Sequence, residues 1–243
     1  MFNANDGSEF ARNRARLEDS PNPYEPEVGS LPDNDVSQAQ KENVNKTGTT
    51  IVGLTTDDGV VMASDMRASL GGRVVSNKNV QKVKEIQPNA ALSISGSVGG
   101  SQSFIRSLRA EANLYEARRG EYMSINALST MASNLLRNGP FFLVVPILGG
   151  VDEDGAHVYS LDPGGSSMSD KYTAQGSGMP YALGTLEQEY SEDLSMDEAV
   201  QVAARAIDSA SERDTSSGNG IHVTRITEDN IDIVGHKDID DVL

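Results

Sequence analysis

The order in which strand-like and helix-like segments follow one another is the feature of this sequence that most constrains its fold. Short β-branched runs separated by glycine-rich turns predict several strands between residues 49 and 95. Apolar residues at helical spacing then predict two helices, at 101–119 and 125–137. More strands are predicted within 142–175, then two helices, and finally two strands within 221–234. Blocks of this kind favour an α+β fold over a doubly wound parallel sheet.

The second pair of helices carries the clearest local signal. The apolar spacing predicts these helices at 180–190 and 196–213. Ser195 and Glu198 stand at the spacing of a capping box, in which each side chain bonds the backbone N–H of the other residue. We therefore expect the last helix to begin directly after Ser195.

The first 48 residues differ in composition from the rest of the chain. They are rich in Asn, Asp, Glu, Ser and Pro, and their apolar residues are isolated and follow no period. Such a segment cannot bury enough apolar surface to offset the entropy lost on ordering. We expect residues 1–48 to be largely disordered and residues 49–243 to form the folded domain. Composition leaves open whether the first segment is a tail, a linker or a removable prosegment.

Charge and cysteine content exclude several classes of protein. The chain has 36 acidic and 20 basic residues and a net charge of −16, the opposite of what a nucleic-acid-binding protein needs. An acidic chain with few lysines fits a salt-rich cytoplasm, although charge alone fits an ordinary acidic protein equally well. Because the sequence contains no cysteine, disulfides and thiol catalysis are excluded.

No segment of the sequence reads as a membrane span or a secretory signal. The first residues lack a basic start followed by an apolar run, and the longest apolar run, 141–148, is too short to cross a bilayer. We therefore expect a soluble cytoplasmic protein that has neither a membrane nor a nucleic acid as a partner.

Histidine, the usual catalytic base of hydrolases, is scarce in this chain. His157 and His222 lie inside predicted strands and His236 lies near the C-terminus, so all three are expected to be structural. No Gly-x-Ser-x-Gly motif is present to hold a nucleophilic serine. The glycine-rich segment 96–101 matches neither a dinucleotide fingerprint nor a P-loop. A serine hydrolase and a nucleotide-binding protein are both disfavoured.

A threonine at the start of the folded domain could supply its own base. An α-amino group has a pKa of about 7.7–8.0, so it can accept the proton of the same residue's hydroxyl near neutral pH. Cleavage between Gly48 and Thr49 would create such a residue, and a glycine lets the hydroxyl approach the preceding carbonyl closely. Taken alone, these residues are better explained as the start of an edge strand than as a processing site.

Several segments after residue 46 resemble, in order and spacing, those of archaeal 20S proteasome β subunits. The first resembles the processing site of that family, and the next two resemble its Asp-x-Arg motif and the segment that holds its active-site lysine. The others resemble its oxyanion-hole glycine and two later active-site segments. The matching segments are 47–53, 65–67, 80–83, 95–99, 176–178 and 213–218. One extra residue, which we place in the turn at 71–72, makes Lys82 and not Gln81 the matching lysine.

The resemblance implies a role for each matching residue. Thr49 would supply the nucleophile and, after cleavage from Gly48, the amine. Lys82 would lower the proton affinity of both groups, and Asp65 would keep Lys82 charged and oriented. The backbone N–H of Gly96 would face the oxyanion. A polar shell around the Thr49 amine would consist of Ser177, Asp214 and Ser217.

The resemblance also implies a substrate pocket beside the nucleophile. Its small or medium apolar lining suggests cleavage after hydrophobic residues, while one lysine near its floor and one glutamine at its side add polar groups. The expected lining residues are Ala68, Val80, Lys84, Ile94, Val98 and Gln102.

At the level of fold and assembly, the resemblance implies the N-terminal nucleophile hydrolase sandwich, a four-layer αββα arrangement. The subunit, cut at Gly48–Thr49, would form seven-membered β rings capped by proteasome α subunits. An unfolding ATPase acting through the α ring would deliver unfolded protein substrates, and no cofactor is implied. Three alternatives remain at this point: the related bacterial two-ring ATP-dependent peptidase, an amidase of the same fold acting on small molecules, and an inactive structural ring subunit.

Overall fold

The computed structural model of this chain describes residues 48–70, 72–141 and 143–243. Three expectations from the sequence therefore concern residues outside the described part. These are the disorder of residues 1–47, the placement of an extra residue at Gly71, and the start of a strand at Phe142.

Two five-stranded antiparallel sheets and one separate hairpin make up the β structure of the described residues. The first sheet runs in the order β10 (Tyr172–Gly176), β1 (Thr50–Thr56), β2 (Gly59–Asp65), β11 (Ile221–Ile226) and β12 (Ile231–His236). The second runs in the order β5 (Val83–Gln87), β6 (Ala90–Gly96), β7 (Val144–Asp152), β8 (Gly155–Leu161) and β9 (Ser167–Asp170). The hairpin consists of β3 (Ala68–Leu70) and β4 (Val74–Asn77).

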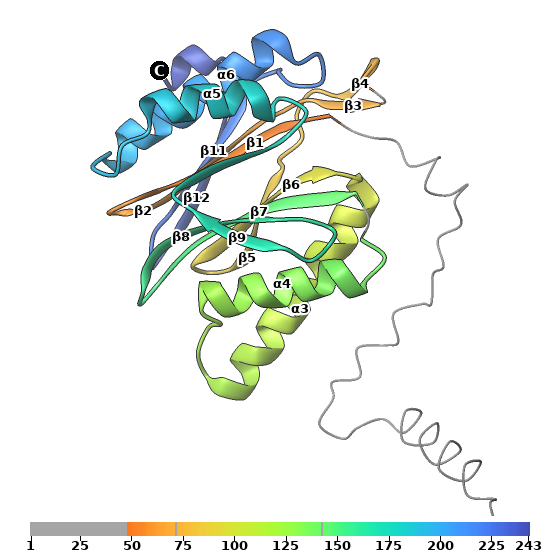
Figure 1. The fold of residues 1–243 in the computed structure, drawn as a ribbon, viewed down its shortest axis with the longest axis vertical. Coiled ribbons are helices and arrows are strands. Elements are labelled where there is room, and N and C mark those ends of the chain that lie inside the picture. The colour runs from red at the N-terminus through yellow and green to blue at the C-terminus, as the bar shows by residue number, and fades with distance from the viewer. Residues whose placement is uncertain (1–47, 71, 142) are drawn as a thin grey trace, which may run out of the picture. The chain divides into compact units, whose positions relative to one another are not determined.

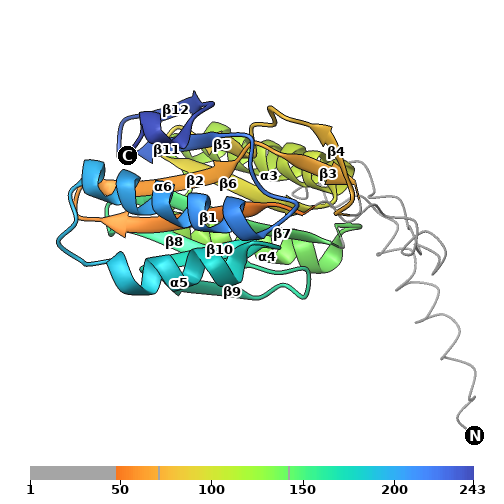
Figure 2. The ribbon, with the colours of Figure 1, turned by 90° about the horizontal axis from the view of Figure 1, so that it is seen from above.

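Each sheet is covered on one face by a pair of helices, and the two sheets face each other (Figures 1 and 2). The first sheet packs against α5 (Met179–Glu189) and α6 (Met196–Arg213), and the second against α3 (Val98–Arg119) and α4 (Ile125–Asn138). A short 3₁₀ helix, Ile239–Asp241, lies near the C-terminus. This is the four-layer αββα sandwich, and it confirms the predicted fold class.

Three separate apolar clusters hold the four layers together, and strand β2 shows how. Its residues alternate between the two faces of the sheet, as the period of a strand requires. Val61 and Ala63 belong to the cluster under α5 and α6, while Val60 and Met62 belong to the cluster between the sheets. The sheets approach closely at Gly149, where an added Cβ would lie 2.9 Å from the sulfur atom of Met62.

Most element boundaries agree with the sequence-based expectations, and helix α6 has the predicted capping box. Helix α3 begins at Val98, earlier than the predicted 101, because the Ser97 side chain accepts a hydrogen bond from the Gly100 backbone N–H at 3.3 Å. Strands β3 and β9 were not predicted. No helix among the residues that the structure describes is long and apolar enough to cross a membrane.

Candidate active site

The first sheet brings the predicted nucleophile next to the predicted aspartate. Thr49 directly precedes β1, and β1 pairs with β2 in antiparallel register from Ile51 opposite Ser64 to Thr56 opposite Gly59. The start of β1 therefore lies beside the end of β2, where Asp65 stands. Thr49 is 3% exposed and Asp65 is fully buried. The hydroxyl of Thr49 donates a hydrogen bond to Asp65 Oδ1 at 2.8 Å.

Both oxygen atoms of the Asp65 carboxylate are saturated with donors. A buried carboxylate needs such compensation, because the loss of its hydration is otherwise costly. Besides Thr49 Oγ1, the donors to Oδ1 are the backbone N–H of Thr50 at 2.9 Å and Lys82 Nζ; the donors to Oδ2 are the backbone N–H groups of Arg67 at 2.9 Å and Gly218 at 3.0 Å. Asp65 thus ties β1, β2 and the loop after α6 to one point.

Lys82 completes a buried triad with Thr49 and Asp65. Its Nζ contacts both Thr49 Oγ1 and Asp65 Oδ1, and the residue is 6% exposed. Burial lowers the pKa of Lys82, an effect that the nearby Asp65 opposes. The ammonium is therefore readier to release its proton than an exposed lysine, and the neutral amine can accept the proton of the Thr49 hydroxyl. The neighbouring Gln81 side chain accepts a hydrogen bond from Lys84 Nζ instead, at 3.2 Å.

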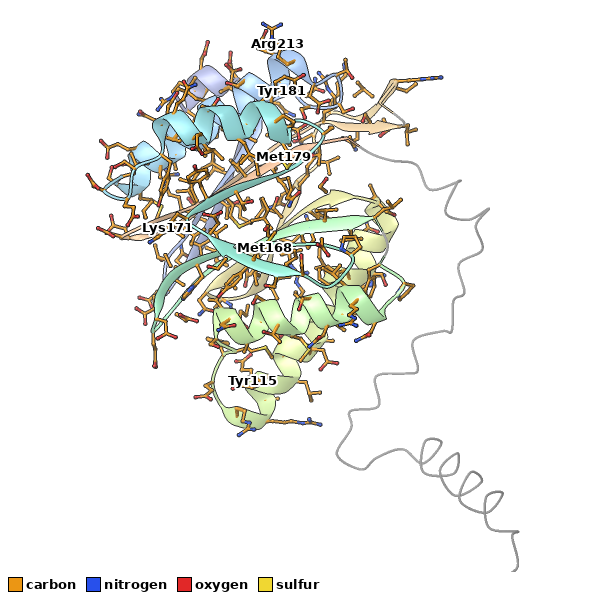
Figure 3. All side chains as sticks on the ribbon, viewed as in Figure 1. Tyr115, Met168, Lys171, Met179, Tyr181 and Arg213 are labelled. Carbon is orange, nitrogen blue, oxygen red and sulfur yellow. The ribbon has the colours of Figure 1, made fainter. Side chains whose placement is uncertain are left out.

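A second polar chain runs from the backbone nitrogen of Thr49 to the loop that follows α6. Helix α6 ends at Arg213, which is labelled in Figure 3. The N–H of Thr49 donates to Ser177 Oγ at 3.0 Å, and Ser177 Oγ donates to Asp214 Oδ2 at 2.6 Å. Ser217 Oγ donates to the same carboxylate oxygen at 2.7 Å. The three residues expected to surround the Thr49 amine thus form one hydrogen-bonded chain that begins at its nitrogen.

Gly48 fits a space in which no side chain can be placed. A Cβ added to Gly48 would lie 2.1 Å from Ser216 Cβ and 2.7 Å from Ser177 Oγ. Its backbone N–H donates to Ser69 Oγ at 3.2 Å. Neither Ser216 nor Ser69 was singled out from the sequence, since an isolated serine in a loop or short strand carries no pattern.

Arg67 holds the loop that contains Asp214, a role that sequence reasoning missed. The guanidinium donates from Nε to Asn219 Oδ1 at 2.9 Å and from Nη1 to the Thr215 carbonyl at 2.8 Å. A Cβ on Gly218 would lie 2.7 Å from Arg67 Nη2. The Asp-x-Arg motif was the available signal, because it places the arginine two residues after the buried aspartate.

The backbone at Gly96 allows only a glycine. Its φ is 103°, and a Cβ there would lie 1.8 Å from the Leu143 carbonyl oxygen. Gly96 and Thr49 line the same cavity, which has a volume of about 330 Å³. The cavity thus holds both the glycine expected at the oxyanion position and the expected nucleophile.

The cavity beside Thr49 contains all six residues expected in the substrate pocket. Ala68, Val80, Lys84, Ile94, Val98 and Gln102 all line it. Asn79, Ser95, Ser101 and Ile105 line it too and were not predicted. The three histidines lie outside this lining, and one of them, His157, contacts Asp152 at 3.0 Å.

Comparisons with known proteins agree with this architecture. The family model described as proteasome subunit matches residues 45–226. A proteasome subunit beta of Halobacterium salinarum is 82% identical over 243 residues, the whole of both chains. A proteasome subunit beta of Natrialba magadii is 65% identical and a proteasome subunit beta 1 of Haloterrigena turkmenica 64% identical, each over 236 residues and 97% of both chains.

These relatives come from halophilic archaea, as the acidic composition suggested. They favour a proteasome subunit over the bacterial two-ring peptidase and over an amidase for small molecules. With the sandwich fold and the buried threonine, they lead to one assignment. The chain belongs to the proteasome subunit family, and within it to the catalytic β subunits of the 20S core particle, which are threonine proteases of the N-terminal nucleophile type.

Proposed function

We propose that Thr49 is the nucleophile of this protease and that Lys82 is the base that first activates it. The observation that carries this proposal is the contact of Thr49 Oγ1 with both Lys82 and Asp65 in a buried site that opens onto a cavity. Lys82 can take the hydroxyl proton because burial lowers its pKa. Asp65 stabilises the ammonium that results.

The same geometry supports self-cleavage at the Gly48–Thr49 bond. While that bond is intact, the nitrogen of Thr49 is an amide and cannot serve as a base, so Lys82 is the base available for the first cut. Attack of Thr49 Oγ1 on the Gly48 carbonyl carbon would move the acyl group from nitrogen to oxygen, and water would then hydrolyse the ester. Residues 1–48 would leave as a prosegment, and residues 49–243 would be the mature catalytic domain.

After this cut, the free amine of Thr49 would join the site. It would lie in the polar shell of Ser177, Asp214 and Ser217, where its neutral form could exchange protons with the nucleophile and the leaving group. The N–H of Gly96 would stabilise the oxyanion, an effect typically worth about 3–4 kcal/mol. The apolar walls of the cavity favour cleavage after large apolar residues over cleavage after arginine or lysine.

We also propose the setting in which this chemistry operates. As a β subunit, the chain assembles with α and β subunits in the core particle. In the finer proposal it forms seven-membered rings in a cytoplasmic particle, and an unfolding ATPase acts through the α ring. The ring would enclose the active sites, so that unfolded polypeptides are the substrates.

Thr49→Ala tests the assignment of the nucleophile. The variant should retain residues 1–48 and show no peptidase activity when it is the only β subunit in the particle, while Thr49→Ser should retain part of both activities because a hydroxyl remains. Intact-mass measurement reports the processing, and a fluorogenic peptide reports the turnover. Normal turnover by Thr49→Ala would refute the assignment.

A further inference from the structure

Lys82 stands on a segment that is neither helix nor strand. Residues 78–82 connect β4 to β5, and Lys82 is the last of them. The place of a side chain on such a segment depends on single hydrogen bonds, because no regular ladder of bonds fixes the backbone. Since the proposed chemistry needs Lys82 Nζ in contact with the nucleophile, whatever holds this segment also holds the base.

Two backbone hydrogen bonds tie the end and the middle of this segment to the rest of the domain. The Lys82 carbonyl accepts the Ile94 N–H at 3.2 Å, and the Val80 N–H donates to the Met66 carbonyl at 2.9 Å. Both bonds join main-chain groups, so they do not depend on the identity of a side chain. The beginning of the segment, at residue 78, is held differently.

A side chain from the C-terminal end of the domain holds the beginning of the segment. Lys237 directly follows β12, and its Nζ donates to the Lys78 carbonyl at 3.3 Å and lies 3.6 Å from the Met66 sulfur atom. A hydrogen bond from an ammonium is charge-assisted and therefore stronger than one between neutral groups. None of the ion pairs among the described residues includes Lys237, so a surface ion pair does not account for its position.

Met66 connects this contact to the other parts of the site. It directly follows Asp65 and is 2% exposed. Its backbone N–H donates to the carbonyls of Gly218 and Gly220, both at 3.2 Å, in the loop after α6. A Cβ on Gly220 would lie 3.0 Å from the Cα of Lys237, so the backbone of Lys237 packs on the same loop. Lys237 therefore contacts the end of β2, the segment of the catalytic lysine and the loop after α6.

We propose that Lys237 is a positioning residue, which holds the base of the reaction in place from outside the site. The inference rests on the proposed function, because it takes Lys82 as that base. Lys237 is exposed and is not among the residues that line the cavity. It acts on the beginning of segment 78–82, and Lys82 stands at the other end. Without the bond from Lys237, the segment would move more, and Lys82 Nζ would be in contact with Thr49 Oγ1 for less of the time.

The test replaces Lys237 by methionine, which keeps an unbranched side chain and removes the ammonium. In a particle with this variant as its only β subunit, kcat for a fluorogenic peptide should fall about three- to tenfold, less than the roughly hundredfold that a 1 Å misplacement can cost. KM should change by less than about twofold, because Ile94 and Val98 in the cavity wall belong to other segments. Lys237→Arg should restore kcat, since a guanidinium can donate to the same carbonyl.

Hydrogen exchange of the same particles tests whether the segment itself is released. Peptides that cover residues 78–82 should exchange their amide hydrogens faster in Lys237→Met than in the wild type. Peptides from β1 and α6 should exchange as in the wild type. A general loss of stability would instead speed exchange in all of these segments together, so the pattern separates positioning from a merely structural role.

Lys78→Met is the matched control. It removes an exposed positive charge at the same place but leaves the carbonyl that accepts the bond from Lys237, so kcat and exchange should both match the wild type. A wild-type kcat in Lys237→Met would overturn the role of Lys237 alone, and so would a lowered kcat without selectively faster exchange at 78–82. Full turnover by Lys82→Ala would instead overturn the proposed function.

Discussion

Replacement of Asp65 by asparagine should both destabilise the subunit and abolish its activity. The two carboxylate oxygens together accept hydrogen bonds from five donors, and an asparagine has one carbonyl oxygen and one NH₂ group in their place. If the NH₂ replaces Oδ2, it faces the backbone N–H groups of Arg67 and Gly218. If it replaces Oδ1, it faces the Thr50 N–H and Lys82. Either orientation leaves two buried donors without an acceptor.

The size of the effect follows from the burial of the pair. Breaking a buried ion pair by removing one partner costs about 3–5 kcal/mol, a large share of the roughly 5–15 kcal/mol by which a domain is stable. For a domain of this size, that loss lowers the unfolding midpoint by about 6–20 °C. Asp65 is also the main group that raises the pKa of Lys82, so its loss should make Lys82 less able to hold the transferred proton. Activity should fall by about 10²–10⁴-fold.

The assay combines a heat-unfolding scan of the assembled particle with the turnover of a fluorogenic peptide that has leucine before the cleaved bond, called the leucine peptide below. Asp57→Asn is the matched control, because Asp57 is exposed at the turn between β1 and β2 and its replacement removes the same charge. A cycle with Lys82→Met adds a second check: the double variant should lose less stability than the two single variants together, since no lone buried charge remains. An Asp65→Asn particle with wild-type midpoint and turnover would refute this reasoning.

Three further predictions concern the lysine, the pH dependence of stability, and salt. Lys82→Ala should lose nearly all peptidase activity and Gln81→Ala should keep it, measured with the leucine peptide; the reverse result would show that the assumed register between Asp65 and Gly96 is wrong. Because burial lowers the pKa of Lys82 below 10.5, the unfolded chain binds more protons than the folded chain between the lowered value and 10.5, so this residue makes stability rise with pH in that window. Urea titrations at several pH values should show a flatter rise for Lys82→Met. Nine of the 36 acidic and five of the 20 basic residues precede Thr49, which leaves a net charge of −12 on residues 49–243. The repulsion between subunits reaches about 30 Å in 0.01 M salt but about 3 Å in 1 M salt, so the particle should dissociate in 0.05 M NaCl and stay intact in 2 M NaCl; sedimentation of an intact active particle at low salt would contradict this.

The α+β class could be predicted from local patterns because most elements have a clear period, whereas the four-layer sandwich was predicted from the family resemblance. Helix α6 is an example, since its capping box and apolar spacing fix its start and its buried face. Strand β9 was missed because its sequence, Ser-Met-Ser-Asp, is polar and its residues are mostly exposed. The first turn of α3 was missed because Gly99 and Gly100 disfavour a helix, while the cap at Ser97 compensates.

The residues that make up the site could be predicted more fully than the hydrogen bonds that join them. Thr49, Asp65, Lys82 and Gly96 come from segments whose order and spacing resemble a known family, and the fold brings them together. The backbone donors to Asp65 could not be predicted; one of them, the Gly218 N–H, lies 153 positions away in the sequence. Every residue except proline has a backbone N–H, so residue identity does not show which of these groups will donate to a given side chain.

Thr49 already contacts Asp65 and Lys82 while the Gly48–Thr49 bond is intact. This arrangement bears on how the proposed precursor would be kept inactive. Many protease precursors are inactive because a loop or a strand must move before the site forms. Here the hydroxyl, Asp65 and Lys82 already touch, and Thr49 is held by the first strand of a central sheet. If the Gly48–Thr49 bond is cut as we propose, activation would be a change of covalent state at a site whose side chains already touch. Under that proposal a single bond cleavage separates the inactive precursor from the active subunit, so control would act on the rate of that cleavage.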